Sequence, residues 1–293
     1  STFIPAADEN NPAQDLERLR WINRIYDQAG LAPLVLRDPA APLDFTNLAT
    51  LAAAAVDGPK VSVIMPAFRS AETLPCALRS VLEQTWENIE IIVVDDASPD
   101  STAAVAESFA AQDPRVKVVR QPVNGGSYAA RNAGLAVASG IYITTHDADD
   151  WSHAQKLEVQ MRLALARPEL AAVFSDWARC SRQLRAGWLH RPWSGLIAKN
   201  ISSILMHRDR YAALGGWDVV RAGGDTELLR RVEHLFGIDA VEKAMEKVPM
   251  AFGRHEAGSL TRQKLTHVAT MLHGPRRDYD EAAAFWRERA ASA

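Results

Sequence analysis

The feature that most constrains the fold is a regular alternation of short apolar runs with longer helical segments in residues 60–145. The apolar runs are rich in β-branched residues and end in polar ones, as buried parallel strands do. Strands that alternate with helices of about 10–15 residues are typical of βαβ units and of a mostly parallel sheet. We predict strands over Lys60–Met65, Ile89–Val94, Val116–Arg120 and Ile141–Thr145, and helices over Ala71–Gln84, Thr102–Gln112 and Ser127–Ser139.

Clusters of polar residues follow these strands at the point where each one ends. Ligands of open α/β sheets bind at the carboxyl ends of the strands, so these clusters are expected to meet in one site. A dinucleotide-binding domain is the nearest rival fold, but it needs GxGxxG after the first strand, where this chain has PAFRSAE. The clusters are Pro66–Phe68, Asp95–Asp96, Asn124–Ser127 and Asp147–Asp150.

The most acidic of these clusters contains Asp147, Asp149 and Asp150. Neighbouring carboxylates repel one another, and a bound cation would relieve that repulsion. In an extended backbone Asp147 and Asp149 would point the same way, with their Cβ atoms about 6–7 Å apart. Mg²⁺ holds its oxygen ligands at about 2.1 Å, so the spacing leaves open which carboxylates bind a metal and which bind a hydroxyl group or water. A helix N-cap or a solvated turn is the alternative.

The segments on either side of this core are expected to be helical. Residues 1–58 form a predicted N-terminal extension with helices over Asp15–Ala29 and Leu48–Val56, and residues 263–293 form a C-terminal tail with helices over Leu265–Leu272 and Tyr279–Ala291. The domain between them, residues 59–262, continues with a predicted helix over Gln155–Ala166 and strands over Leu170–Trp177, Asn200–His207 and Val248–His255.

Charge and composition exclude several kinds of partner. The net charge of −3 provides no basic field for nucleic acid. No run of about 18 apolar residues predicts a transmembrane helix, and the first residues lack the features of a signal peptide. Cys76 and Cys180 lie far apart in the sequence, which favours free thiols in a reducing cytoplasm. We therefore expect a cytoplasmic protein, with peripheral contact at the inner face of the membrane and the oligomeric state left open.

Several motifs occur together along the domain. The first is VSVIMPAF, a strand that ends in Pro66-Ala67-Phe68. It is followed, in this order, by SVLEQTW, VVDDASPDST, the ARN of Ala130–Asn132 and the DADD of Asp147–Asp150. Over about residues 60–262 the chain thereby resembles the family 2 inverting glycosyltransferases of the GT-A fold. The resemblance implies a Rossmann-like, mostly parallel α/β sheet and a nucleotide-sugar donor.

The resemblance assigns the donor site to the first half of the domain. A carboxylate can accept a hydrogen bond from the imide N–H of uracil. Asp96 matches the family position that accepts this bond, so a UDP-sugar is the expected donor. The alternative role for Asp96 is to cap the helix that follows. Asp149 and Asp150 would bind Mg²⁺ or Mn²⁺, hard cations that prefer oxygen ligands. His255 would be a third ligand or would contact the diphosphate, with an ordinary surface histidine as the alternative. For Arg131, a salt bridge on the helix surface is the alternative. The other nucleotide-binding residues implied are Pro66, Ala67, Phe68, Ser127, Arg131 and Asp147.

The catalytic base is expected in GGDTEL, residues Gly223–Leu228, which resembles the family's Glu-Asp-x-x-Leu element. Asp225 aligns with the aspartate that acts as the base. Gly224 stands where the family usually has a second acidic residue, so Asp218 and Glu227 stay open as alternatives. A plain helix N-cap is the structural alternative for Asp225.

The acceptor surface is less clearly marked. Residues 179–193 interleave arginines with tryptophans; tryptophans stack on sugar faces, and arginines bind phosphate or carboxylate. We assign Trp188, Trp217 and Asp218 to a surface for an anionic glycan or a phosphorylated lipid head group, with an exposed basic hairpin as the alternative.

The sequence thus predicts a metal-dependent inverting glycosyltransferase that moves a sugar from a nucleotide-sugar to a hydroxyl group of a glycan or lipid-linked acceptor by single displacement. The alternative from another class is a non-catalytic module that binds a nucleotide-sugar or a glycan with the same fold. A nucleotidyltransferase fits less well, because it would usually have a glycine-rich, basic phosphate loop after the first strand.

Overall fold

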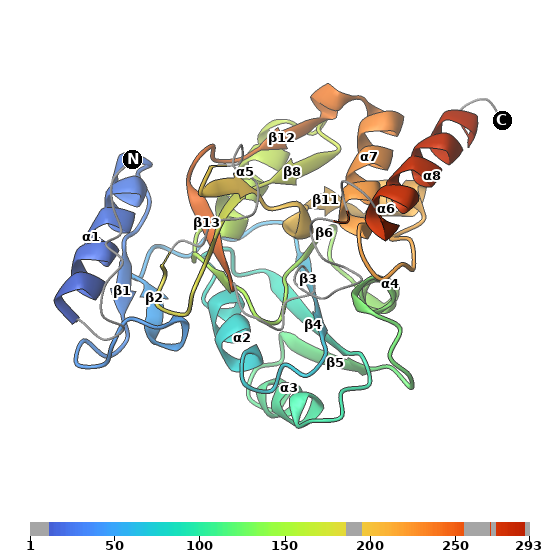
Figure 1. The fold of residues 1–293 in the computed structure, drawn as a ribbon. Coiled ribbons are helices and arrows are strands. Elements are labelled where there is room, and N and C mark those ends of the chain that lie inside the picture. The colour runs from blue at the N-terminus through green and yellow to red at the C-terminus, as the bar shows by residue number, and fades with distance from the viewer. Residues whose placement is uncertain (1–11, 186–194, 255–269, 271–273, 291–293) are drawn as a thin grey trace.

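A computed structural model describes residues 12–185, 195–254, 270 and 274–290 of the chain. Its centre is a five-stranded sheet in which β3, β4, β5 and β6 are parallel and β11 is antiparallel to β6 (Figure 1). This mostly parallel α/β sheet confirms the predicted fold class. The strand order is β11 (Met206–His207), β6 (Tyr142–Thr145), β3 (Val61–Ala67), β4 (Ile89–Asp95) and β5 (Val116–Arg120).

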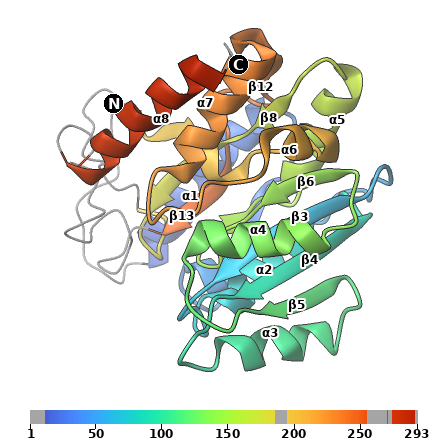
Figure 2. The same cartoon turned by 90° about the vertical axis from the view of Figure 1, so that its right-hand side faces the viewer.

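Helices cover both faces of this sheet, because alternate side chains of each strand point to opposite faces. Val63 and Met65 of β3 pack towards α2 (Leu74–Leu82), α3 (Thr102–Ala110) and α5 (Lys156–Ala166). Ile64 lies on the other face, which is covered by α4 (Ser127–Val137), α6 (Arg208–Leu214) and α7 (Gly224–Phe236). Figure 2 shows α4 lying across β3 and β4. A Cβ atom on Gly134 would lie 2.5 Å from the Ile64 side chain, so α4 approaches the sheet closely.

A second sheet is built from the second half of the chain. Its order is β10 (Ile197–Lys199), β9 (Asp176–Cys180), β13 (Pro249–Arg254) and β7 (Trp151–Ser152), while β8 (Ala172–Phe174) pairs separately with β12 (Val241–Lys243). The single strand predicted over Leu170–Trp177 is therefore two short strands, β8 and β9, which pair with different partners.

The strand predicted over Asn200–His207 is wrong in its first half. Residues Ile201–Ser203 form a 3-10 helix, and only Met206–His207 pair with the central sheet. The hydroxyl groups of Ser202 and Ser203 donate to the side-chain and main-chain oxygens of Asn200 at 2.9 and 3.3 Å. Such local bonds from serine side chains compete with strand pairing.

The N-terminal segment packs against the second sheet. Its helix α1 (Pro12–Gln28) and the hairpin of β1 (Leu34–Leu36) and β2 (Leu48–Thr50) share a hydrophobic core with Trp151 and Phe252. The Tyr26 hydroxyl donates a hydrogen bond to the carbonyl of Pro249 at 2.6 Å. The helix predicted over Leu48–Val56 is wrong, because pairing with β1 extends the chain from Leu48 and buries that side chain.

The last described helix, α8 (Pro275–Ala290), lies against α7 (Figure 2). Arg287 contacts Glu227 at 3.3 Å, and the Tyr279 hydroxyl donates to Asp218 at 2.8 Å. The tail helix predicted over Leu265–Leu272 lies outside the described residues, except for position 270. Within the described parts of the chain, every helix is too short or too polar to cross a membrane.

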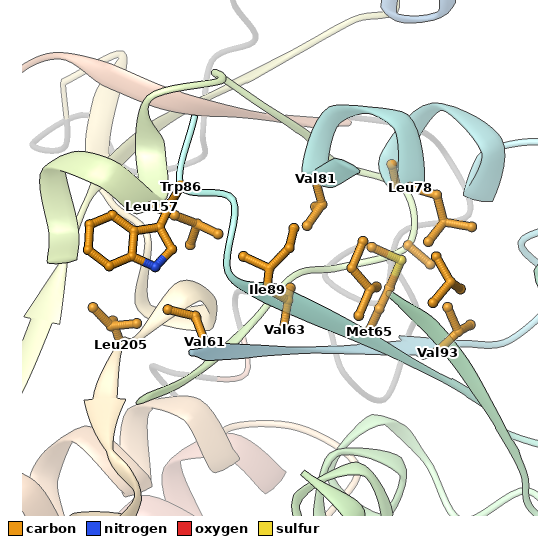
Figure 3. Packing of buried hydrophobic residues seen from close by; sticks show 14 of the residues in the cluster. Val61, Val63, Met65, Leu78, Val81, Trp86, Ile89, Val93, Leu157 and Leu205 are labelled. Atoms are coloured by element: carbon orange, nitrogen blue, oxygen red, sulfur yellow. The ribbon is translucent and has the colours of Figure 1, made fainter. Parts of the chain in front are cut away.

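The Trp86 side chain is the largest apolar group at one end of the core, where Figure 3 shows it near Leu157 and Leu205. We expect Trp86→Ala to lower the free energy of unfolding by about 3–5 kcal/mol, because it leaves a cavity and removes buried apolar surface. Urea denaturation measures this loss. Trp286→Ala is the matched control, since Trp286 is 63% exposed and its loss should cost less than about 0.5 kcal/mol. Equal losses in the two variants would contradict the core position of Trp86.

Candidate functional site

The loops after three strands lie side by side at the carboxyl edge of the central sheet. The Asp96 amide donates to the carbonyl of Ala67 at 2.9 Å, and the His146 amide donates to the carbonyl of Ile64 at 3.0 Å. Pro66 and Ala67 belong to the end of β3. The polar clusters predicted after β3, β4 and β6 therefore meet at one edge.

Asp96 organises the turn between β5 and α4. Its carboxylate accepts hydrogen bonds from the amides of Gly125 and Gly126 at 2.7 and 2.8 Å. The Asn124 side chain donates to the main-chain carbonyl of Asp96 at 3.1 Å. The turn ends at Gly126 with φ of 88°, and α4 begins at Ser127. Each carboxylate oxygen of Asp96 keeps a further lone pair, although the residue is only 2% exposed.

An exposed aromatic ring follows β3 in the same region. Phe68 is 42% exposed, and the guanidinium of Arg69 lies 5.3 Å from its ring centre. Arg69 has a φ of 52°, an uncommon value for a residue with a side chain, and its amide donates to Ser98 at 3.1 Å. Ser101 is the N-cap residue of α3, and Asp100 accepts a hydrogen bond from the amide of Thr102 at 3.2 Å. The Asp96 carboxylate binds the amides of Gly125 and Gly126 and so does not cap α3.

Asp149 and Asp150 lie in a buried turn that follows β6. Burial and the neighbouring carboxylates raise the pKa of Asp149 to about 6 and raise that of Asp150 well above its usual value. A divalent cation would offset both causes at once. Among the described residues no three His, Cys, Asp or Glu side chains converge as a complete metal site, and His255 lies outside the described residues. Two hard oxygen donors still suit Mg²⁺ or Mn²⁺, which commonly complete their shells with waters and substrate phosphates.

Three basic residues from distant parts of the chain surround this acidic turn. Lys156 on α5, Arg179 on β9 and Arg254 at the end of β13 lower the electrostatic cost of its carboxylates. Lys156 is 3% exposed, and burial lowers its pKa to about 8. Arg254 donates from Nε to the carbonyl of Asp149 at 2.9 Å. Sequence reasoning missed Lys156, because its position in a helix does not indicate that its ammonium group turns inward.

Arg131 joins two of the predicted site residues. Its Nη1 donates to Asp225 and its Nη2 donates to Asp147 at 2.8 Å. The Tyr128 hydroxyl, one turn earlier on α4, donates to the other oxygen of Asp225 at 3.3 Å. Burial raises the pKa of Asp225, and the contacts with Arg131 and Tyr128 oppose that rise. Arg131 therefore forms a buried double ion pair instead of a salt bridge on the helix surface.

The start of α7 explains the glycine at position 224. Gly223 is the N-cap residue, with φ of 93°, and Asp225 lies in the first turn, so Asp225 is not the N-cap. A Cβ atom on Gly224 would lie 3.0 Å from the ring of Tyr128. The ring of Tyr128 thus occupies the space that a side chain at position 224 would need.

The two alternative bases have other partners. Glu227 is 3% exposed and is paired with Arg231 and Arg287. Asp218 accepts the hydrogen bond from Tyr279 of α8. Of the three carboxylates, Asp225 is the one that the described contacts link to Asp147.

Of the three acceptor residues predicted from sequence, Trp217 and Asp218 lie in the described part of the chain. Trp217 was expected to offer a face for a sugar, but it is 3% exposed and packs 5.0 Å from the ring of Tyr211, so that assignment is wrong. Its ring fills the core beneath α4 and α6. Trp188 lies outside the described residues. Asp218 remains half-exposed at the start of the loop before α7.

Family models and curated proteins agree on the chain's relationships. The model described as Glycosyl transferase family 2 matches residues 62–231. The putative glycosyltransferase EpsE of Bacillus subtilis (strain 168) is 31% identical over 226 residues, which cover 72% of this chain and 78% of EpsE. The UDP-Glc:alpha-D-GlcNAc-diphosphoundecaprenol beta-1,3-glucosyltransferase WfgD of Escherichia coli is 39% identical over 105 residues, 36% of this chain and 41% of WfgD.

Other relatives match over a smaller share of their length. Glycosyltransferase GlyG of Streptococcus pneumoniae serotype 4 is 42% identical over 90 residues, 31% of this chain and 30% of GlyG. Among solved structures, S. aureus TarS 1-349 in complex with UDP-GlcNAc has a TM-score of 0.57 and 17% identity, covering 80% of this chain and 73% of that one. At this identity the likeness shows a shared fold.

Asp150→Asn should increase the free energy of unfolding of the metal-free protein near neutral pH by about 1 kcal/mol or more, because it removes a buried carboxylate with a raised pKa. The gain should vanish below about pH 4, where the carboxyl group is protonated in both the folded and unfolded states. Mn²⁺ should raise the unfolding temperature of the wild type but not that of this variant.

Thermal unfolding with and without Mn²⁺ measures both effects. Asp100→Asn is the control, since Asp100 accepts hydrogen bonds from Thr102 at the start of α3, and its loss should affect stability without changing the response to Mn²⁺. An Asp150→Asn variant that responds to Mn²⁺ as the wild type does would contradict the role of Asp150.

Proposed function

The chain belongs to glycosyl transferase family 2, and on that premise we propose that this glycosyltransferase is a metal-dependent inverting enzyme that uses a UDP-sugar. The observation that carries the proposal is the contact of Arg131 with both Asp147 and Asp225. It holds the predicted base next to the loop assigned to the donor. A direct displacement needs such a base near the acceptor hydroxyl, on the face opposite the leaving diphosphate.

The donor assignment rests on Asp96 and Phe68. Asp96 has free acceptor capacity for an imide N–H, and the exposed ring of Phe68 suits stacking against a base. WfgD is named as a UDP-Glc transferase and TarS was solved with UDP-GlcNAc, which supports a UDP-sugar for this chain. A dTDP-sugar carries the same imide group, so Asp96 alone does not distinguish the two.

Asp149 and Asp150 would hold Mg²⁺ or Mn²⁺, and His255 is the third candidate ligand by resemblance. When bound there, the cation supplies a Lewis acid for the leaving diphosphate. The chain itself contributes Lys156, Arg179 and Arg254, which limit repulsion between the carboxylates and keep the acidic turn folded.

Asp225 would remove the proton from the acceptor hydroxyl as that oxygen attacks the anomeric carbon of the sugar. The bond to the diphosphate breaks in the same step, so the configuration inverts and no covalent sugar–protein intermediate forms. A general base of this kind typically contributes about 10²–10⁴ in rate.

The acceptor is proposed to be a glycan or a lipid-linked sugar that approaches between Asp218 and Asp225. WfgD is named for a diphosphoundecaprenol-linked acceptor, which supports the lipid-linked class. The hydrogen bond from Tyr279 to Asp218 joins α8 to this part of the molecule.

Calorimetric titration of UDP, GDP and dTDP, with Mn²⁺ or with EDTA, tests the donor and metal assignments together. UDP binding that is lost in EDTA is the expected result. Binding that persists in EDTA would contradict the metal assignment, and binding of GDP alone would contradict the UDP donor. Absence of nucleotide binding would favour the non-catalytic glycan-binding module.

Asp225→Asn should lower kcat at least about 100-fold while UDP binding stays within about threefold of the wild type, because the amide cannot accept the proton. Glu227→Gln is the matched control: it weakens contacts with Arg231 and Arg287, so stability should fall while kcat per folded molecule is retained. Near-wild-type turnover by Asp225→Asn would exclude Asp225 as the base.

A further inference from the structure

Two side chains on one face of α4 hold the carboxylate of Asp225 from both oxygens. Tyr128 and Arg131 are three residues apart, so they lie next to each other on the helix surface. Arg131 donates to Oδ1 of Asp225, and the Tyr128 hydroxyl donates to Oδ2 at 3.3 Å. The second guanidinium nitrogen of Arg131 donates to Asp147 at 2.8 Å.

Arg131 is more deeply buried than the two carboxylates that it binds. The side chain of Arg131 is only 3% exposed, whereas those of Asp147 and Asp225 are 32% and 22% exposed. The guanidinium also lies 5.3 Å from the ring centre of Tyr128 and 5.9 Å from that of Trp217. The arginine is thus enclosed by the protein, while both carboxylates keep surface that a substrate can reach.

We propose that Arg131 and Tyr128 are positioning residues that orient the base Asp225, and that Arg131 fixes the base relative to the donor-side Asp147. This inference rests on the proposed function of Asp225. Each carboxylate oxygen uses one lone pair on its partner and keeps another for the acceptor hydroxyl. The two bonds hold the carboxylate in one orientation, and the shared guanidinium sets its distance from the donor loop.

The same contacts affect the charge state of the base. The titratable groups that face Asp225 among the described residues are Arg131 and Tyr128 of α4, Asp147 after β6 and Tyr211 of α6. Burial and Asp147 favour the protonated form of Asp225, which cannot accept a proton, and Arg131 opposes them. Loss of the guanidinium should therefore raise the pKa of Asp225 further and move the acidic limb of the rate profile to higher pH.

Gly224 permits this arrangement. A Cβ atom at position 224 would lie 3.0 Å from the ring of Tyr128, so a larger residue would displace the ring and its hydroxyl from Asp225. The acidic residue that the family resemblance led us to expect at this position is replaced by a tyrosine from a different helix, which contacts the same aspartate.

The test measures kcat and KM against pH for the full chain, with UDP-sugar turnover followed as UDP release. Arg131→Gln should lower kcat at least about 10-fold and shift its acidic limb upward by about one pH unit or more, since a hydrogen-bonded cation lowers a carboxyl pKa by about 1–3 units. Arg131→Lys retains the positive charge but loses the two-pronged guanidinium that binds both carboxylates. The acidic limb of its kcat–pH profile should therefore stay near that of the wild type, while kcat itself falls. Tyr128→Phe should lower kcat about 2–10-fold, the loss of one hydrogen bond.

Arg208→Gln is the matched control. Arg208 is the first residue of α6 and donates to the carbonyls of Ala138 and Gly140, which precede β6 at the other end of the sheet. Its loss should lower stability and leave the acidic limb unchanged. If Arg131→Gln does not fold, Arg131→Lys decides: wild-type kcat in that variant overturns the proposal, and lowered kcat with an unshifted limb supports it.

A folded Arg131→Gln variant with the wild-type acidic limb would also overturn the inference. Failure of the proposed function is distinguishable, because the wild type itself would then release no UDP beyond the Asp225→Asn background. In that case, UDP binding measured in parallel shows whether the donor site is intact.

Discussion

The pairing of the buried Arg131 guanidinium with two carboxylates is the interaction on which the site depends. A charge buried as deeply as that of Arg131 is tolerated only when it is paired and hydrogen-bonded. Asp147 and Asp225 would repel each other without it, and neither alone would satisfy both ends of the fork. The three charges are therefore stable as a set, and the set forms only when the loop after β6, α4 and the start of α7 are all in place.

The acidic turn of Asp149 and Asp150 is also stabilised by basic residues from other parts of the chain. Burial and the repulsion between neighbouring carboxylates raise the pKa values of Asp149 and Asp150, so their charged forms are less stable than those of exposed carboxylates. Lys156, Arg179 and Arg254 come from α5, β9 and β13, so one helix and two strands of the second sheet contribute to one charge balance. This balance is incomplete, which leaves the turn able to gain stability from a further cation.

The sequence predicted the central sheet well, because buried parallel strands are nearly continuous apolar runs and the runs of β3, β4, β5 and β6 are unambiguous. It also predicted that the loops carrying Asp96 and Asp147 lie at the carboxyl edge of this sheet. It did not predict what holds them, since the bonds of Arg131 and the burial of Lys156 join residues far apart in the chain. Leu48–Val56 and Trp217 were misassigned because an alanine-rich run and a lone tryptophan do not reveal which surface they pack against.

The charge balance of the acidic turn depends on a residue outside the segment that the family model matches. Arg254 lies beyond residues 62–231, yet its Nε binds the carbonyl of Asp149 and its guanidinium lies 4.9 Å from the ring centre of Phe45. Phe45 in turn precedes β2 and shares a core with Tyr26 and Trp151. Sequence divergence in the N-terminal hairpin can therefore change the charge balance of the acidic turn through Arg254, while every residue of the turn itself stays the same.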